Sequence, residues 1–218
     1  RPGIVEQVEE DLEILQNLAV SVSYRWELAK QYDVIGLAQE FAQTLRAELD
    51  YLREARNAER FAKNFDRNPN VHIPRIVWEA TTSRVLTLER IRGIKVSNLS
   101  ALDAAGINRK TLAEQIAQLN LQMVFEDGFF HADPHPGNFF IESDGRIGLI
   151  DFGMVGSLDS QTQEHLSGIL LAVISQDADR LVDAFLELGF AQQTVDRSLL
   201  RRDLQYLISR YYGQPLGE

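Results

Sequence analysis

The stretch FFHADPHPGNFFIESDGRIGLIDFG, Phe129 to Gly153, decides how this sequence is interpreted. Two short alternating runs, NFFIE and RIGLI, flank the turn sequence SDG, whose Asp and Gly tolerate positive φ. The pattern therefore predicts a β-hairpin. Because a hairpin brings its two ends together, we expect Asn138 and Asp151 to face each other across a few ångströms.

The residues at the two ends of this hairpin predict a magnesium site. The oxygen atoms of Asn138 and Asp151 suit a hard octahedral cation that keeps some water and shares oxygens with phosphate. Asp133 lies five residues before Asn138, where a carboxylate is placed to orient or deprotonate a hydroxyl or water that attacks the terminal phosphate. His-x-Asp, an Asn five residues beyond the Asp, a hairpin and Asp-Phe-Gly follow one another in this order in kinase-like phosphotransferases.

Zinc binding by the two histidines of the stretch is the alternative. His131 and His135 are four residues apart, which on a helix would place both imidazoles on one face. Pro134 and Pro136 disfavour a helix here, because each removes a backbone donor and extends the residue before it. We therefore expect His131 to hold the loop through hydrogen bonds, and we assign no role to His135.

Composition excludes several other classes of function. The chain has 218 residues, is 44% hydrophobic and carries a formal net charge of −10, which disfavours nucleic-acid binding. The lack of cysteine excludes disulfides and thiolate chemistry. No apolar run approaches the roughly 18 residues of a spanning helix. We expect an intracellular protein, soluble as given, and a piece of a longer chain, because the sequence starts at Arg1 without methionine.

The sequence before the decisive stretch predicts two helices and two strands. Apolar residues at steps of three or four predict a helix from Ile4 to Val22. The same periodicity predicts one helix of about eight turns from Val34 to the region of Pro69. The segments VHIPRIVWEATT and RVLTLERI are rich in β-branched residues and read as strands, with Pro74 at an edge or a bulge.

The remaining sequence is predicted to be helical. Asn108 is a suitable N-cap, and Gly128 suits the left-handed residue beyond the end of that helix. Further helices are expected at residues 160–174, 178–188 and 194–212. Helices, a small antiparallel sheet and more helices indicate a mostly helical α+β fold in two lobes, with a hinge near Glu89 to Gly93.

Three motifs together indicate a family. They are HADPHPGN, the run ELDYLREARNAERF from Glu48 to Phe61, and RPGI followed by an acidic helix. With these motifs the chain resembles the UbiB family of atypical protein-kinase-like ATPases, which support biosynthesis of isoprenoid quinones such as ubiquinone and plastoquinone. The resemblance implies a protein-kinase-like fold, with an incomplete N-lobe over residues 1–90 and a helical C-lobe over residues 91–218.

The resemblance also assigns roles in the site to three acidic residues. It places the Glu-x-Asp signature, which tunes or gates the site, on Glu48 and Asp50. It places on Glu54 the glutamate that pairs with a nucleotide-anchoring lysine. On one continuous helix, Asp50 and Glu54 share a face while Glu48 points away from it. The alternative for this run is a solvated helix face.

The nucleotide is expected to bind where the second strand meets the hinge. The resemblance places a gatekeeper at Leu88 and adenine contacts on the backbone of Glu89 and Ile91. It implies ATP and Mg²⁺ as cofactors. It also implies quinone-biosynthesis proteins or lipid precursors as partners, and peripheral membrane association of the longer protein.

The function expected from the resemblance is an ATPase or phosphotransferase in quinone biosynthesis. Two alternatives remain open. One is a small-molecule phosphotransferase of the aminoglycoside or choline kinase type, which uses a similar HxDxHPGN loop. The other is a non-catalytic scaffold that holds lipid precursors or biosynthetic partners.

The sequence lacks three elements that the family carries upstream of its Arg-Pro-Gly: the lysine, an Ala-rich loop and a Lys-x-Gly-Gln helix. We therefore predict that these 218 residues alone bind Mg²⁺ and ATP poorly and turn over little ATP. Titration calorimetry checks this prediction. Micromolar, Mg²⁺-dependent ATP binding to the isolated chain would contradict it.

Overall fold

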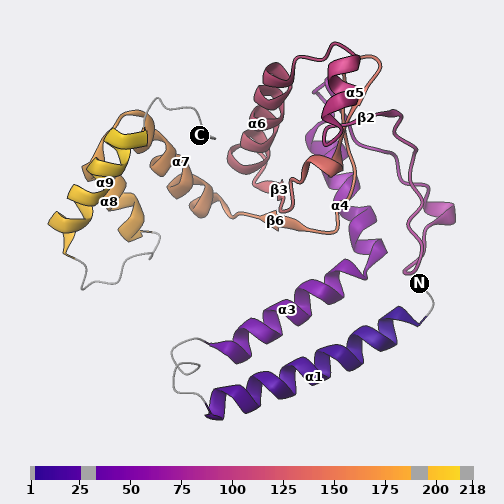
Figure 1. Ribbon diagram of the computed structural model, residues 1–218, viewed down its shortest axis with the longest axis horizontal. Helices are drawn as coiled ribbons and strands as arrows, with labels where there is room; N and C mark the ends of the chain where they lie inside the picture. Colours follow the sequence, from indigo (N-terminus) through magenta and orange to yellow (C-terminus); the bar gives the residue numbers. More distant parts are fainter. Residues whose placement is uncertain (1–2, 26–32, 188–195, 212–218) are drawn as a thin grey trace. The chain divides into compact units, whose positions relative to one another are not determined.

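The computed structural model describes residues 3–25, 33–187 and 196–211 (Figure 1). Contacts divide the chain into two compact units. The first consists of Arg1–Ile107 and Ala132–Val155, and the second of Asn108–His131 and Gly156–Glu218. The decisive stretch from Asp133 onward thus belongs to the first unit. The lobe boundary near residue 90 stays a prediction.

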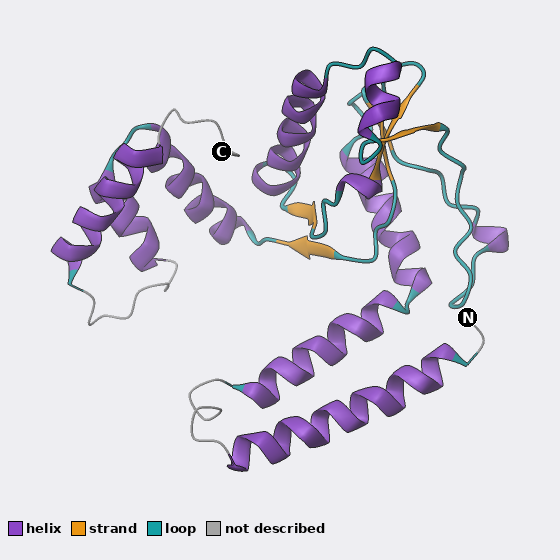
Figure 2. Cartoon of the chain, in the orientation of Figure 1, coloured by secondary structure: helices purple, strands orange, loops and turns teal. Residues whose placement is uncertain are grey.

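The first unit combines helices with a four-stranded sheet. Helices α1 and α3 lie side by side and run antiparallel (Figure 2). The elements are α1 (Ile4–Arg25), α3 (Val34–Glu48), α4 (Tyr51–Asn64), β1 (Val71–His72), η1 (Trp78–Ala80), β2 (Gly93–Lys95), α5 (Leu99–Ala104), η2 (Pro136–Asn138), β4 (Phe139–Glu142) and β5 (Ile147–Leu149).

The second unit is mainly helical. Its elements are α6 (Arg109–Phe125), β3 (Phe129–His131), α7 (Ser160–Ile174), α8 (Ala178–Glu187) and α9 (Arg197–Tyr211). Strand β6 (Val155–Ser157) begins in the first unit and pairs with β3. Ala172, Leu181 and Ile208 form the buried centre of α7, α8 and α9. Within the described ranges, every helix is too short or too polar to cross a bilayer.

The helix predictions for this unit are confirmed to within a few residues. The side chain of Asn108 accepts hydrogen bonds from the backbone N–H of Lys110 at 3.0 Å and of Thr111 at 3.2 Å, as an N-cap does. Gly128 has a φ of +57°, the left-handed conformation expected beyond α6.

The predicted hairpin is the middle of the four-stranded sheet, whose strand order is β1-β5-β4-β2. Strand β4 pairs antiparallel with β5 and with β2, whereas β1 pairs parallel with β5. Phe139 lies opposite Leu149 in the register, and both are buried. Gly145, with a φ of +87°, supplies the left-handed residue of the turn.

The single long helix predicted from Val34 is wrong. The chain forms two helices, α3 and α4, separated at Leu49 and Asp50. Asp50 adopts the non-helical φ of −94° and ψ of 84°, and its side chain accepts the N–H of Arg53 at 3.1 Å. A short acidic side chain that caps its own backbone ends one helix and starts the next. Asp50 therefore does not share a helix face with Glu54.

The two strands predicted between residues 71 and 91 are largely wrong. Only β1 is a regular strand, and the rest is held by isolated bridges that join Ile76 to Leu88 and Thr82 to Val85. The hydroxyl of Thr81 donates to Val77 O at 2.9 Å and accepts from Thr87 N at 3.1 Å. This side chain thus replaces part of the backbone ladder.

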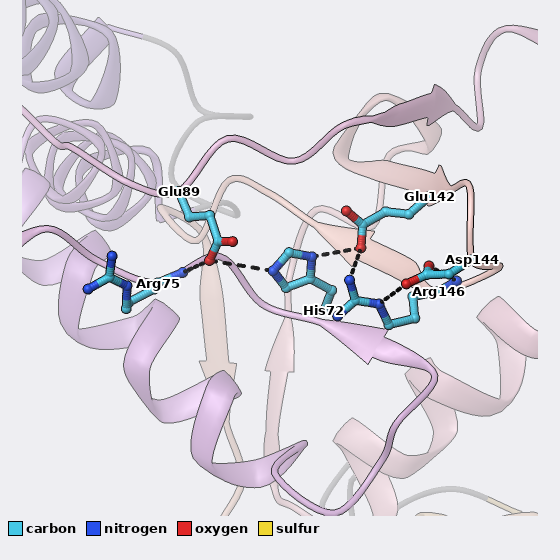
Figure 3. Close-up of polar contacts among 6 residues, drawn as sticks. All are labelled: His72, Arg75, Glu89, Glu142, Asp144 and Arg146. Carbon is cyan, nitrogen blue, oxygen red and sulfur yellow. Dashed lines mark hydrogen bonds and ion pairs between the residues drawn. The ribbon is translucent and has the colours of Figure 1, made fainter.

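A series of polar contacts links the edge strand β1 to the hairpin of β4 and β5 (Figure 3). His72 Nδ1 lies 2.7 Å from Glu142 Oε2, and its Nε2 lies 3.6 Å from Glu89 Oε2. Arg146 also contacts Glu142, at 3.1 Å. Glu89 accepts the backbone N–H of Arg75 at 3.3 Å. That hydrogen bond, followed by the nearby His72, lowers the pKa of the Glu89 carboxyl below its ordinary value of 4.5.

The lowered pKa predicts how stability depends on pH. A carboxyl with a lowered pKa in the folded state stabilises the fold above its unfolded pKa, and this is lost as the pH falls through the folded pKa. Changing Glu89 to Gln should destabilise the protein above about pH 5 by at most about 1 kcal/mol, since the group is solvent-exposed. Urea unfolding of both proteins between about pH 3 and pH 7 measures this.

The control is Glu79→Gln, the same change at an exposed residue of η1. The wild-type and Glu89→Gln curves should converge at acid pH. A constant gap across the whole range would show that the carboxylate charge of Glu89 is not the cause.

Candidate functional site

The base of the hairpin brings the two predicted metal ligands together along the backbone. Ile150 donates its N–H to the carbonyl of Asn138 at 2.9 Å. Asp151 is the next residue, so Asn138 and Asp151 occupy adjacent strand ends as the sequence predicted. Their role as metal ligands stays a prediction.

The loop before the hairpin is fixed by its own hydrogen bonds. His135 N donates to Asp133 O at 2.7 Å, and Asn138 N donates to His135 O at 2.8 Å. The side chain of Asn138 donates its Nδ2 to Asp133 O at 3.2 Å. This bond orients the amide of Asn138 and leaves its Oδ1 as the atom that could coordinate a cation. Asp133 and Asn138 are therefore positioned as one unit.

His135, to which the sequence assigned no role, caps the short helix η2. Its Nδ1 accepts the N–H of Gly137 at 3.1 Å. A Cβ at Gly137 would lie 3.0 Å from that same nitrogen, so a larger residue there would require His135 to shift by a few tenths of an ångström. His131 is buried, and the hydrogen bonds by which it is expected to hold the loop stay a prediction.

Asp151 has an unusual backbone. Its φ is +67°, in the left-handed region that few residues other than glycine adopt. Its Oδ1 accepts the N–H of Gly153 at 3.2 Å, which leaves the second carboxylate oxygen for a cation. A strained conformation at a polar residue persists only when its surroundings enforce it.

Helix α4 supplies that enforcement by holding the next residue, Phe152. Asn57 Nδ2 donates to Phe152 O at 2.8 Å, and Phe152 N donates to Glu54 Oε1 at 3.3 Å. Glu54 and Asn57 are three residues apart on one face of α4. The ring of Phe152 is fully buried and lies 5.4 Å from the ring of Phe61, centroid to centroid. The backbone N–H, the carbonyl and the ring of Phe152 are thus all held by one helix.

The three acidic residues assigned by resemblance have different environments. Glu54 lies in the first turn of α4 and contacts the Asp-Phe-Gly segment. Asp50 is the N-cap of α4 and lies 4.0 Å from Arg56 through its Oδ2. Glu48 ends α3, and its side chain lies outside the described residues. Their functional roles stay predictions.

The expected adenine-binding segment lies against the hairpin. Leu88 forms a bridge with Ile76, and Glu89 N donates to Arg75 O at 2.8 Å. A Cβ at Gly148 would lie 2.9 Å from Ile91 Cδ1, so the side chain of Ile91 covers the middle of β5. Contact of this segment with adenine stays a prediction.

Sequence reasoning missed Asn57 and His72. A signal for Asn57 was present: it is a polar residue between Ala55 and Ala58, both buried on the inner side of α4. In the part of the chain that the structure describes, no three His, Cys, Asp or Glu side chains cluster to hold a metal. A cation here would depend on one amide, one carboxylate and the phosphates of a nucleotide.

Comparisons with known proteins agree with the motif pattern. A family model described as ABC1 atypical kinase-like domain matches residues 1–185. The Arabidopsis thaliana protein ACTIVITY OF BC1 COMPLEX KINASE 7, chloroplastic, is 37% identical over 98% of this chain and 31% of its own length. Probable protein kinase UbiB of Marinobacter nauticus is 36% identical over 87% of this chain and 36% of its own length. The chain spans about a third of the length of these curated relatives.

A solved structure shows the same fold. Rv3197 of Mycobacterium tuberculosis, determined in complex with erythromycin, is 25% identical with a TM-score of 0.70. The match covers 97% of this chain and 52% of that one. The predicted mostly helical α+β, kinase-like fold is confirmed by this likeness and by the family match.

The contact between α4 and Phe152 generates a prediction. Asn57→Leu should destabilise the protein by about 1–3 kcal/mol, because it leaves the Phe152 carbonyl without its donor. Urea unfolding measures the loss. Hydrogen exchange should also show weaker protection of the Phe152 amide. Asn64→Leu is the matched control on α4, since the described residues show no side-chain hydrogen bond of Asn64. Equal effects of both variants would contradict the assigned contact.

Proposed function

The chain belongs to the ABC1 atypical kinase-like family. We propose that it binds ATP and Mg²⁺ as part of an ATPase or phosphotransferase that supports isoprenoid quinone biosynthesis. The observation that carries the proposal is the hydrogen bond between Ile150 N and Asn138 O, which sets Asn138 beside Asp151. The link to quinones comes from the resemblance to the UbiB family. We retain residues 1–90 and 91–218 as the two lobes.

In this proposal Asn138 and Asp151 hold Mg²⁺ on the phosphates. The support is chemical: each side chain has one polar atom engaged by the protein and one oxygen left over. Oxygen ligands and a small number of protein contacts are what Mg²⁺ favours at a nucleotide. The ion would neutralise charge that develops on the transferred phosphoryl group.

Asp133 orients the attacking hydroxyl or water. It is exposed, and its backbone carbonyl is tied to the amide of Asn138. Because the backbone of Asp133 is tied to Asn138, its carboxylate would stay near the proposed metal site, where it can align a nucleophile with the terminal phosphate.

Helix α4 and the segment before β2 complete the nucleotide site. Glu54 would pair with a lysine that anchors the phosphates, while Glu48 and Asp50 tune or gate access. The backbone of Glu89 and Ile91 would meet adenine next to Leu88. The packing of Ile91 on β5 supports this placement, because it brings the segment of Glu89 and Ile91 against the hairpin of β4 and β5.

Two other functions share the same fold. A small-molecule phosphotransferase would use the same loop on a hydroxylated acceptor, and a screen of such acceptors separates it from the favoured function. A scaffold would hold lipid precursors or biosynthetic proteins without phosphoryl transfer, and it should not depend on Asp151.

The test uses the full-length protein. Asp151→Asn should lower ATP turnover at least about 100-fold, because the charge that balances the metal and phosphates is lost. The matched control is Asp144→Asn, the same change on the turn at the far end of the hairpin, where turnover should stay within about twofold of wild type. ATP hydrolysis and quinone content are measured for both. Normal quinone content with Asp151→Asn would favour a scaffold and contradict the proposal.

A further inference from the structure

His72 lies between two carboxylates that belong to different parts of the proposed nucleotide site (Figure 3). Its Nδ1 lies 2.7 Å from Glu142 Oε2, at the turn end of β4, and its Nε2 lies 3.6 Å from Glu89 Oε2. We call residues 88–91 the adenine segment, because the proposed function assigns adenine to its backbone. His72 therefore links the adenine segment to the hairpin whose base carries Asn138 and Asp151.

Attraction to a carboxylate on each side requires the charged form of the imidazole. A neutral ring has a hydrogen on one nitrogen only, and its other nitrogen is an acceptor. If the neutral ring donates Nδ1–H to Glu142, the lone pair of Nε2 faces the carboxylate of Glu89, and two acceptors repel each other. The imidazolium has an N–H on each nitrogen and attracts both carboxylates. The link from His72 to Glu89 is thus attractive only while the ring carries its second proton.

The groups around His72 determine which of its two contacts can change. Glu142 Oε2 is shared with Arg146 Nη2 at 3.1 Å, and the side chains of His72 and Glu142 are only 14% and 11% exposed. Glu89 is 47% exposed and its contact is longer, so this contact is the weaker one. The N–H of Arg75 is the main cause that lowers the pKa of the Glu89 carboxyl, which therefore stays negative at neutral pH.

The backbone places this link beside the adenine segment. The cross-strand partner of His72 on β5 is Gly148, which brings no charge to the ring. A Cβ at Gly148 would lie 2.9 Å from Ile91 Cδ1, and Glu89 N donates to Arg75 O at 2.8 Å. The adenine segment is thus joined to the sheet by the packing of Ile91, by backbone pairing and by the ion pair with His72.

We propose that His72 is a positioning residue of the nucleotide site, whose imidazolium holds the adenine segment at a fixed separation from the hairpin that would bind Mg²⁺. The inference rests on the proposed function. A nucleotide held at both ends needs the two segments correctly spaced before it arrives, because ordering them on binding costs affinity.

The role of His72 predicts a specific effect of pH. The charge of a histidine ordinarily changes between about pH 5 and pH 8, so the link is present at the acid end of this range and is lost as the pH rises. His72 takes no part in the chemical step. Loss of its proton should therefore raise the KM for ATP and leave kcat unchanged.

The test compares the full-length protein with its His72→Gln variant at about pH 5.5 and about pH 8.5. Glutamine keeps a donor for Glu142 but carries no charge. At the acid pH the variant should raise the KM for ATP about two- to fivefold, as expected for a partly exposed ion pair, with kcat within about twofold of wild type. At the alkaline pH the two KM values should agree. The ionisation of ATP is common to both proteins, so the ratio of their KM values reports on His72.

Glu89→Gln breaks the same link from its exposed end and serves if His72→Gln folds poorly. Its glutamine still accepts the N–H of Arg75, so only the charge is lost. It should give the same KM ratios, and the double variant should be no weaker than either single variant, because both remove one link. The control is His165→Gln on α7, where the histidine lies 3.9 Å from Glu187, and it should keep the wild-type KM at both pH values.

Hydrogen exchange without nucleotide tests the link independently of ATP. The amide of Glu89 lies in the adenine segment. After correction for the intrinsic effect of pH on exchange, its protection in wild type should fall about two- to fivefold between about pH 5.5 and about pH 8.5. In His72→Gln its protection should not depend on pH.

Three results would overturn the inference: a KM ratio that is the same at both pH values, a fall in kcat without a change in KM, or pH-independent protection of Glu89 in wild type. A merely structural role of His72 gives the first of these. Normal ATP turnover with an unchanged KM ratio would refute the positioning role alone. If wild type binds no ATP at either pH, the proposed function fails and the positioning role fails with it.

Discussion

The hold of helix α4 on Phe152 is the constraint on which the candidate site depends. Asn57 binds the carbonyl of Phe152, and Glu54 binds its N–H, from successive turns of one helix. Because both sides of this residue are fixed, the left-handed conformation of Asp151 just before it is maintained. A shift of α4 would therefore move the Asp151 carboxylate, so the positions of the helix and of this side chain are physically coupled.

The hairpin provides the second fixed point. Strands β4 and β5 are central in their sheet, and their inward side chains, including Phe139 and Leu149, are buried. At the turn end, the contacts of His72 with Glu142 and Glu89 join the hairpin to the sheet edge and to the expected adenine segment. A close-packed core with polar links at its margin resists deformation. The strand ends that carry Asn138 and Asp151 thus project from a rigid support.

Local patterns predicted the elements whose side chains alternate or repeat without interruption. The hairpin, α1 and the C-terminal helices fall in this class, because period 2 and period 3.6 directly reflect burial on one face. The same periodicity failed between α3 and α4, where apolar spacing continues across the break that Asp50 makes by capping. It failed again near Thr81, whose hydroxyl takes backbone partners that a strand would have used. Side-chain competition for backbone groups carries no periodic signal.

The sequence by itself determined that Asn138 and Asp151 lie at adjacent ends of one hairpin, since that hairpin is a local structure fixed by turn chemistry and alternation. Only the tertiary structure decided what holds them in place. Asn57 is 95 residues from Phe152, and its hydrogen bond exists because α4 packs on the Asp-Phe-Gly segment. The ion pair of Glu9 and Arg46 likewise joins α1 to α3 across 37 residues of sequence. Contacts between distant segments depend on the packed arrangement of whole elements, which no local pattern encodes.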